Sequence, residues 1–293
     1  MTGQASAGAG GPHAARSPAV VVERAHAKAN LVLRVGPPRA DGLHPICSLF
    51  AALELADEVR VAPADRDEVL CSGVEGDNLA AAAVTAFRAA APAAGLPPLR
   101  IEIDKRIPVA AGLGGGSADA AAVLRAANAI AGAPLSPDDL RRVGAGLGSD
   151  VPSQVEPGHA LVTGVGQAVE RVDLAAMTLV LVPQPEGLST AAVYRELDRL
   201  GRHAADLDPA PLRELARRPV AELAAGLANE LQPAALALRP ELTAPIEALL
   251  AAGALAAQVT GSGPTTFGVF AERAAAERAA AALPGSIATG LHG

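Results

Sequence analysis

The stretch "PVAAGLGGGSADAA", residues 108–121, constrains the fold more than any other part of the chain. An alternating segment, "LRIEID", precedes it and an alanine-rich segment follows it, which predicts a strand, a glycine loop and a helix in direct succession. Bare glycine backbone lets a phosphate approach closely, and a helix N-terminus offers it unpaired N–H groups. The glycines alone also fit a plain turn, and the strand before and helix after them favour the phosphate site.

The spacing of these glycines matches neither of two common phosphate-binding motifs. A Walker loop needs a Lys-Ser or Lys-Thr pair after its last glycine, and "GLGGGS" also departs from the dinucleotide-binding spacing. A helix is predicted over residues 117–131, so that Ser117 stands at its start. Its hydroxyl can cap the helix, contact Mg²⁺ or bond a phosphate oxygen, and the sequence leaves these roles open.

The composition limits the core and the partners of the chain. The 293 residues include one tyrosine, four phenylalanines and no tryptophan, so the core must be aliphatic. The formal net charge of −7 argues against a nucleic-acid partner, because phosphates require a basic face. Cys47 and Cys71 are too few for a disulfide framework, which favours a reducing compartment. No protein partner is implied.

The N-terminal residues and the apolar runs bear on localisation. Residues 1–18 are small and polar, and they predict a disordered tail rather than a signal peptide. Charges interrupt the alanine-rich runs every few residues, so no stretch approaches a membrane span. We therefore expect a cytoplasmic protein without a membrane partner.

The basic residues are unevenly chosen. They comprise 22 arginines and only two lysines, Lys28 and Lys105. A compact ammonium differs from a planar guanidinium fork, so each lysine can mark a position that needs a point charge. For either lysine taken alone, chance is an equally good explanation of its presence.

Strands dominate the first half of the chain, and helices and strands interleave in the second. This pattern predicts an α+β fold with a boundary near residues 165–175. The predicted strands are 20–35, 44–53, 57–63, 67–73, 99–108, 159–164, 178–183, 255–261, 265–270 and 286–289. The predicted helices are 78–94 (capped by Asp77), 117–131, one that begins at Pro137 after the cap Ser136, 190–200, 243–252 and 272–283.

Four further motifs carry polar groups with two interpretations each. Lys28 and Asn30 lie two residues apart on a predicted strand and therefore share one face of it. This face is either part of a functional site or a solvated edge of the sheet. His44 ends the "ADGLH" turn, where a lone histidine is more often structural. Asp150 precedes Val-Pro, the place of an N-cap or of a functional carboxylate. The turn "VTGSGPTTF", residues 259–267, fits an anion nest or a tight hairpin.

In this order along the chain, the motifs resemble those of the GHMP kinases. "PVAAGLGGGSADAA" resembles the nucleotide loop of that family, and "AKANLVLRVGPPRADGLH" its opening motif. "LGSDVP" and "TGSGPTTF" are similar to its third and C-terminal motifs, and "GDNLAAAA" and "IDKRIP" to its adenine-side segments. The resemblance runs from about residue 24 to residue 285.

The resemblance implies a fold, an activity and a role for each matching residue. The implied fold is the two-domain GHMP fold, with residues 19–168 and 169–293 as domains and the active site in the cleft between them. The implied activity is transfer of phosphate from ATP, with Mg²⁺, to an alcohol of a small molecule that carries a cytidine diphosphate moiety. Asp150 would accept the hydroxyl proton, and Lys28 would pair with it and neutralise charge on the moving phosphoryl group.

The nucleotide and the substrate would each have their own residues. The matching nucleotide positions are Asn78, Leu79, Lys105, Pro108, Gly112, Leu113, Gly114, Gly115, Gly116, Ser117 and Ala118, within or around the loop at residues 108–118. The matching substrate positions are Asn30, His44, Thr190 and Tyr194. The resemblance identifies no metal ligands.

The chain departs from the family pattern at several places. Leu43 stands where an aromatic residue is usual, which bears on recognition of the cytosine. "DVPSQV" replaces an aromatic run, Gln167 stands where glutamate is common, and Asn229-Glu230 where Asn-Asp is usual. Two alternatives stay open: a GHMP kinase for a homoserine-like alcohol, and a nucleotide-binding relative without catalysis.

Overall fold

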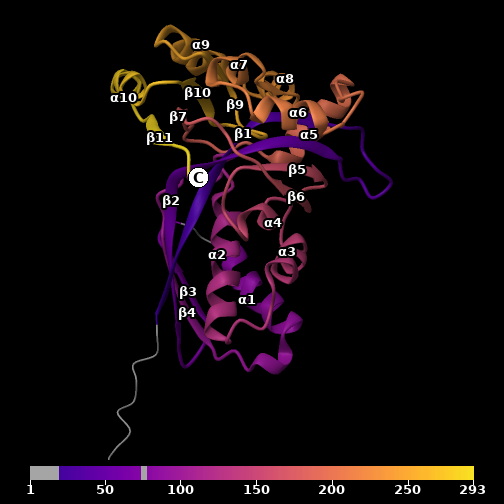
Figure 1. The fold of residues 1–293 in the computed structure, drawn as a ribbon, viewed down its shortest axis with the longest axis vertical. Helices are drawn as coiled ribbons and strands as arrows, with labels where there is room; N and C mark the ends of the chain where they lie inside the picture. Colours follow the sequence, from indigo (N-terminus) through magenta and orange to yellow (C-terminus); the bar gives the residue numbers. More distant parts are fainter. Residues whose placement is uncertain (1–19, 74–77) are drawn as a thin grey trace, which may run out of the picture.

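Two long antiparallel strands connect the two ends of the molecule (Figure 1). The computed structural model describes residues 20–73 and 78–293. In it β1 (Val21–Val35) pairs with β2 (Ile46–Pro63) along almost their whole length. The strands predicted at 44–53 and 57–63 are one strand, because β2 runs through a register shift after Ala52, opposite Lys28, and its pairing with β1 resumes at Ala56, opposite His26. The tail predicted over residues 1–18 and the predicted cap Asp77 lie outside the described residues.

The first sheet is built around these strands in the order β3-β4-β2-β1-β8, and β5 and β6 extend it from β2. Its shorter strands are β3 (Glu68–Cys71), β4 (Leu99–Asp104), β5 (Ala160–Gly164), β6 (Ala168–Arg171) and β8 (Ala228–Asn229). The register of β1 against β2 shifts between His26 and Lys28 and again between Asn30 and Val32. Such bulges re-aim side chains, and here they enclose the Lys28–Asn30 segment.

Helices with small side chains cover one face of this sheet. They are α1 (Leu79–Ala90), α2 (Gly115–Ile130), α3 (Pro137–Ala145) and α4 (Val151–Gln154), with a 3-10 turn at Pro92–Ala94. The alanines of α2 pack with Val59, Val61, Ile101 and Ile103, which gives the aliphatic core that the composition predicts. Ser136 caps α3 in a capping box, as predicted. Asn78 caps α1, and α2 begins two residues before the predicted start at Ser117.

The second sheet has the order β11-β7-β10-β9 and is antiparallel where its strands pair. Its strands are β7 (Thr178–Val182), β9 (Ala256–Val259), β10 (Thr266–Phe270) and β11 (Ile287–Gly290). The helices of this half are α5 (Thr190–Leu200), α6 (Ala210–Ala216), α7 (Val220–Ala225), α8 (Gln232–Leu238), α9 (Thr243–Ala251) and α10 (Arg273–Ala282), with a 3-10 turn at Pro240–Leu242. Because β8 joins β1 of the first sheet, the two halves share strands.

The predicted α+β class is confirmed, and the errors are local. The short helices α4, α6, α7 and α8 were not predicted, since each spans only four to seven residues. The domain boundary between residues 168 and 169 stays a prediction. Over residues 20–73 and 78–293, the helices are all too short or too polar to cross a bilayer.

Candidate active site

A lysine and an aspartate from distant parts of the chain meet at one point. Lys28 Nζ lies 3.3 Å from Asp150 Oδ2, and their side chains are 7% and 27% exposed. Asp150 directly precedes α4, and its carboxylate turns to Lys28 instead of capping that helix. Asp150 therefore occupies the predicted N-cap position, but its side chain makes no capping hydrogen bond. The pair is almost closed on the lysine side and partly open on the carboxylate side.

The two bulges of β1 hold Lys28 and Asn30 inside the protein. Lys28 Nζ donates to Asn30 Oδ1 at 2.8 Å, and Asn30 Nδ2 donates to Ser48 Oγ at 2.9 Å. The ammonium also lies 5.0 Å from the centre of the Phe50 ring. Both residues are buried, so the solvated-edge interpretation is wrong. The amide of Asn30 positions the ammonium.

The glycine loop passes directly beside this pair. Gly112 and Gly114 have φ angles of 75° and 72°, a backbone that favours glycine. A Cβ on Gly114 would lie 3.0 Å from Lys28 Cγ, so the missing side chain makes room for the lysine. Gly114 is the N-cap of α2, which places Ser117 in the first turn and excludes it as the cap. The first N–H groups of α2 are thereby presented at the loop.

The C-terminal glycine turn packs against the glycine loop at residues 108–117. It joins β9 to β10 as a hairpin, which fits the second of its two interpretations. A Cβ on Gly112 would lie 2.7 Å from the carbonyl oxygen of Gly263, so the two backbones touch. Asn30 N donates to Thr260 Oγ1 at 3.0 Å, and Ser262 Oγ lies 2.9 Å from Thr190 Oγ1. The sequence predicted this turn as a candidate site, but it did not indicate that the hydroxyl groups of Thr260 and Ser262 would belong to the site.

The second lysine lies on the other side of the loop, between two carboxylates. Lys105 Nζ donates to Asp57 Oδ2 at 2.5 Å and to Asp119 Oδ2 at 2.8 Å. Asp57 Oδ1 also accepts the backbone N–H groups of Arg106 and Ile107, whereas Asp119 Oδ1 has no hydrogen-bond partner among the described residues. Asp57 and Asp119 were not predicted, although an acid that contacts a buried lysine is a general expectation.

Burial and charge act on this triad in opposite directions. Burial by itself would lower the pKa of Lys105, and the charges and hydrogen bonds of Asp119 and Asp57 outweigh it and raise that pKa. Burial raises the pKa of Asp119 to about 7, against the opposing effect of Lys105. One ammonium facing two carboxylates leaves an excess negative charge. This excess charge agrees in direction with the raised pKa of Asp119, whose Oδ1 has no hydrogen-bond partner among the described residues.

Three cavities follow one another along these groups. The loop cavity, about 350 Å³, is lined by Asn78, Leu79, Lys105 and the loop from Pro108 to Ser117. It shares Gly112 and Gly114 with the Lys28 cavity, about 200 Å³, which contains Asn30 and Asp150. Thr190 and Tyr194 line both the Lys28 cavity and a third one of about 560 Å³, the Leu43 cavity. Ala118, also predicted, is buried in the core instead.

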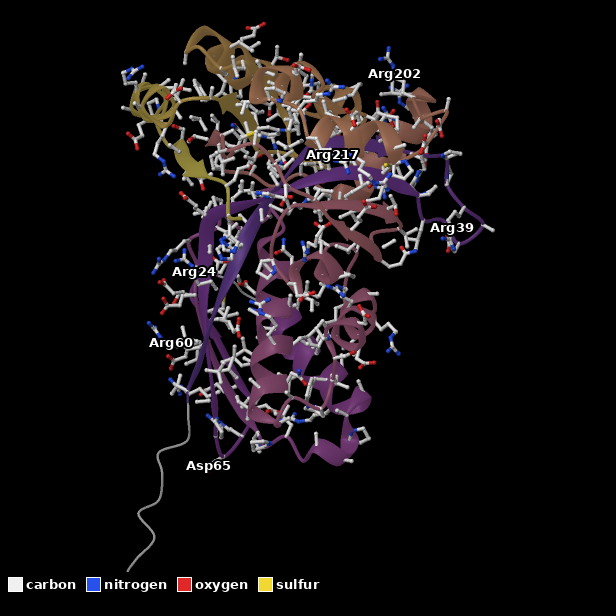
Figure 2. All side chains as sticks on the ribbon, in the orientation of Figure 1. Arg24, Arg39, Arg60, Asp65, Arg202 and Arg217 are labelled. Atoms are coloured by element: carbon white, nitrogen blue, oxygen red, sulfur yellow. The ribbon has the colours of Figure 1, made fainter. Side chains whose placement is uncertain are left out.

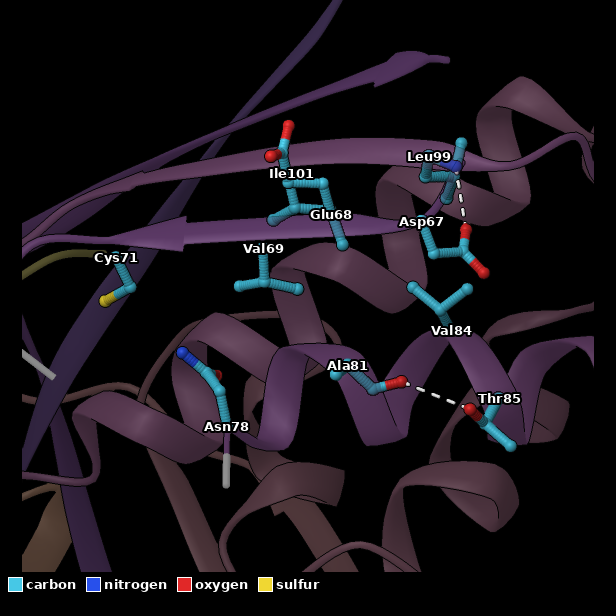
Figure 3. A pocket seen from close by; sticks show the side chains of 10 residues that line it. All are labelled: Asp67, Glu68, Val69, Cys71, Asn78, Ala81, Val84, Thr85, Leu99 and Ile101. Atoms are coloured by element: carbon cyan, nitrogen blue, oxygen red, sulfur yellow. Dashed lines mark hydrogen bonds between the residues drawn. The ribbon is translucent and has the colours of Figure 1, made fainter. Parts of the chain in front are cut away.

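A further cavity of about 430 Å³ adjoins the loop cavity through Cys71 and Asn78. Figure 3 shows it between β3 and α1, with Val69 and Val84 facing each other across it. Asn78 Oδ1 accepts the backbone N–H of Ala80, so this side chain both begins α1 and lines the two cavities. The loop cavity thus continues into a recess with a mixed polar and apolar lining.

The Leu43 cavity is the most apolar part of the site. Leu43 is 52% exposed at its mouth, and the rings of His44 and Tyr194 lie 5.0 Å apart and tilted by 49°. Burial, with a smaller contribution from the charge of Asp150, raises the pKa of Tyr194 to about 12. The phenol is therefore neutral. Thr190 begins α5 after the cap Ser189, which directs its hydroxyl to the Lys28 cavity.

The arginines lie elsewhere. Every arginine among the described residues is at least partly exposed, and the labelled Arg24, Arg39, Arg60, Arg202 and Arg217 project from the outside of the molecule (Figure 2). Both lysines, by contrast, border the glycine loop: a Cβ on Gly115 would lie 3.3 Å from Lys105 Nζ. The two lysines mark the site.

The glycine loop, the Lys28–Asp150 pair and the fold can be compared with known families. Residues 78–158 match the GHMP kinases N terminal domain, and residues 212–287 match the GHMP kinases C terminal domain. The chain belongs to the GHMP kinase family, and it is an ATP-dependent small-molecule kinase.

Its relatives carry a more specific name. The chain is 45% identical over 276 residues to a 4-diphosphocytidyl-2-C-methyl-D-erythritol kinase of Salinispora arenicola, covering 89% of this chain and 86% of that protein. It is 44% identical to the enzyme of the same name from Streptomyces coelicolor, covering 84% and 86%.

Solved structures agree on the fold. A crystal structure of 4-(cytidine 5'-diphospho)-2C-methyl-D-erythritol kinase is similar with a TM-score of 0.78 and 33% identity, covering 93% of this chain and 100% of that one. A homoserine kinase from Cytophaga hutchinsonii has a TM-score of 0.62 at 19% identity, with 96% of each chain covered, and shows the fold alone.

Proposed function

We propose that this kinase phosphorylates the 2-hydroxyl of 4-diphosphocytidyl-2-C-methyl-D-erythritol, a step of non-mevalonate isoprenoid precursor synthesis. One observation carries the proposal: the Lys28–Asp150 pair lies in a cavity that shares walls with the glycine loop on one side and with Thr190 and Tyr194 on the other. A phosphate donor and an alcohol can thus approach the same pair from opposite sides. The names of the relatives supply the identity of the alcohol.

In the proposed reaction the alcohol oxygen attacks the γ-phosphorus of ATP and loses its proton to Asp150. The new O–P bond forms as the bond from the γ-phosphorus to the β,γ-bridging oxygen breaks, and ADP leaves. Lys28 pairs with the Asp150 carboxylate and neutralises the charge that develops on the phosphoryl group. The loop from Gly112 to Ser117 and the N-terminus of α2 hold the phosphates.

The residues at the loop also fit a magnesium ion. Mg²⁺ takes oxygen ligands, mainly from carboxylates and substrate phosphates. The Ser117 hydroxyl lies beside the loop that carries Asp150, since a Cβ on Gly148 would be 3.8 Å from Ser117 Oγ. Ser117 and Asp150 would hold the ion together with the phosphates. When bound, the ion neutralises phosphate charge.

The substrate would lie in the Leu43 cavity, with its base between Leu43 and Tyr194 and within reach of His44. Asn30 and Thr190 would border the reacting end, and Asn78, Leu79 and Lys105 the nucleoside of ATP. The apolar lining of this cavity suits a base better than it suits a small zwitterion such as homoserine.

The test is a panel of alcohols incubated with the enzyme, ATP and Mg²⁺, with products identified by phosphorus NMR. We expect a new phosphomonoester from 4-diphosphocytidyl-2-C-methyl-D-erythritol and none from homoserine or from 2-C-methyl-D-erythritol 4-phosphate, which lacks the cytidine. Phosphorylation of homoserine alone would contradict the substrate assignment and leave the kinase chemistry intact. ATP binding without transfer to any alcohol would contradict the catalytic role of the pair.

A further inference from the structure

Three ligating side chains converge at the edge of the Leu43 cavity, and the reaction above uses only one of them. His44 comes from the loop before β2, Asp198 from the end of α5, and His203 from the segment after it. Asp198 Oδ1 lies 3.6 Å from His44 Nε2 and 2.9 Å from His203 Nε2. One ligand atom from each residue lies within 4.8 Å of the other two.

The backbone determines which nitrogen of His44 faces this cluster. His44 Nδ1 lies 3.0 Å from the carbonyl oxygen of Gly36, which can only accept, so Nδ1 carries a hydrogen. In the neutral ring, Nε2 then directs its lone pair toward the Asp198 carboxylate. Metal-ligating histidines are commonly oriented by such a bond from the other ring nitrogen. A lone pair and a carboxylate that face each other in this way are suited to bind a metal ion between them.

The spacing and the donor types favour one class of metal. In a tetrahedral zinc site with bonds of about 2.0–2.2 Å, ligand atoms lie roughly 3.3–3.6 Å apart. The two separations that involve Asp198 Oδ1, 2.9 and 3.6 Å, lie below that spacing and at its upper edge, and all three ligand atoms lie within 4.8 Å of one another. Two imidazoles and one carboxylate suit Zn²⁺ and similar transition metals, whereas Mg²⁺ and Ca²⁺ prefer oxygen ligands alone.

We propose that His44, Asp198 and His203 form a binding site for a divalent transition metal of the Zn²⁺ class. Three protein ligands leave a fourth position for water on the side of the Leu43 cavity, which both His44 and Asp198 line. Bound metal takes His44 away from the alcohol substrate, so the ion inhibits by competition with the alcohol and not with ATP. This last consequence rests on the proposed function, and the metal site itself does not.

The binding test uses the full chain without ATP, titrated with ZnCl2 by calorimetry and with CoCl2 by visible absorption. We expect one equivalent of Zn²⁺ and the intense visible bands of tetrahedral Co²⁺. His203→Gln removes one ligand outside the proposed substrate site and is expected to weaken binding about tenfold or more. His292→Gln is the matched control, because that histidine lies against His26 far from the cluster and its loss leaves the metal site intact. Equal binding by wild type and His203→Gln overturns the proposal.

The kinetic test measures KM for the alcohol and for ATP at a buffered free Zn²⁺ concentration. Wild type is expected to show a higher KM for the alcohol with an unchanged KM for ATP, and His203→Gln to be much less sensitive. Zn²⁺ binding that depends on His203 supports the metal site even if the enzyme proves to phosphorylate a different alcohol. An unchanged KM for the alcohol in zinc-loaded enzyme overturns the competition, whatever the substrate.

Discussion

Lys28 and Lys105 flank the same glycine loop, yet their surroundings differ in one decisive respect. Lys105 lies between two carboxylates whose side chains are 0% and 4% exposed. Lys28 faces one carboxylate that is 27% exposed and opens into a cavity. The carboxylates beside Lys105 are buried, although Lys105 itself borders the loop cavity, whereas the carboxylate beside Lys28 has room for a third group.

The difference separates two uses of a buried ammonium. The Lys105 triad links β2 to α2, because Asp57 belongs to β2 and Asp119 to α2. It also places a fixed positive charge beside the loop. An open pair can accept a proton from an alcohol that enters the cavity. We therefore expect changes at Lys105 to act on stability and nucleotide binding, and changes at Lys28 to act on turnover.

The largest difference is expected between Lys105→Met and Lys28→Met in the free energy of unfolding. Lys105→Met leaves two buried carboxylates without a cation, and removing one member of a buried pair costs about 3–5 kcal/mol. Lys28→Met leaves a carboxylate that reaches the cavity and should cost clearly less, while lowering kcat by roughly 10²–10³. Urea unfolding and steady-state assays of both variants test this. Equal losses of stability would contradict the comparison.

The next largest difference is expected between alanine substitutions at two neighbouring loop glycines, in their effects on kcat and on KM for ATP. Gly114→Ala places a Cβ 3.0 Å from Lys28 Cγ at a φ of 72°, and misplacing a catalytic group can cost about 10²-fold in rate. Gly115→Ala places its Cβ 3.3 Å from Lys105 Nζ and should raise KM for ATP with little change in kcat. If the two variants change kcat equally, the division of roles between the lysines fails.

The pH dependence of stability should report the Lys105 triad. The folded-state pKa of Asp119 is raised to about 7 from an ordinary 3.8, so the folded protein binds more protons than the unfolded one between these values. This carboxyl therefore stabilises the fold fully below pH 4, and its contribution is lost as the pH rises to about 7. Asp119→Asn should flatten that part of the stability profile measured by urea unfolding. A profile unchanged from wild type would place the extra proton elsewhere.

The smallest effect is expected at Leu43, which lines the cavity next to the Lys28 cavity. Leu43 offers apolar contact where a second ring would stack on a base, and stacking is worth roughly 1–3 kcal/mol. Leu43→Tyr should lower KM for the cytidine substrate several-fold with kcat nearly unchanged. Steady-state kinetics check this, with Leu250→Tyr as a control at an exposed apolar position of α9, outside the cavities of the site. A KM that does not respond would argue against a base in the Leu43 cavity.

Local patterns predicted the fold class and the groups that meet at the site. The alternation of β4, the cap Ser136 and the glycine loop between a strand and a helix follow from neighbouring residues, and the structure confirms all three. Lys28 and Asp150 were predicted through the resemblance, and their 3.3 Å separation is a result of folding. The partners Asp57, Asp119 and Thr260 were missed. They come from elements far apart in the chain, and no local pattern marks a carboxylate or hydroxyl that becomes buried.

Turnover by Asp150→Asn tests the central claim most directly. Asparagine keeps the size of the side chain but cannot take the proton of the alcohol. We predict that kcat falls by roughly 10²–10⁴, while the dissociation constant for ATP from calorimetry and the free energy of unfolding stay close to those of wild type. Near wild-type kcat in this variant would contradict the account, because Asp150 would then be a structural residue and the open lysine pair would not carry the chemistry.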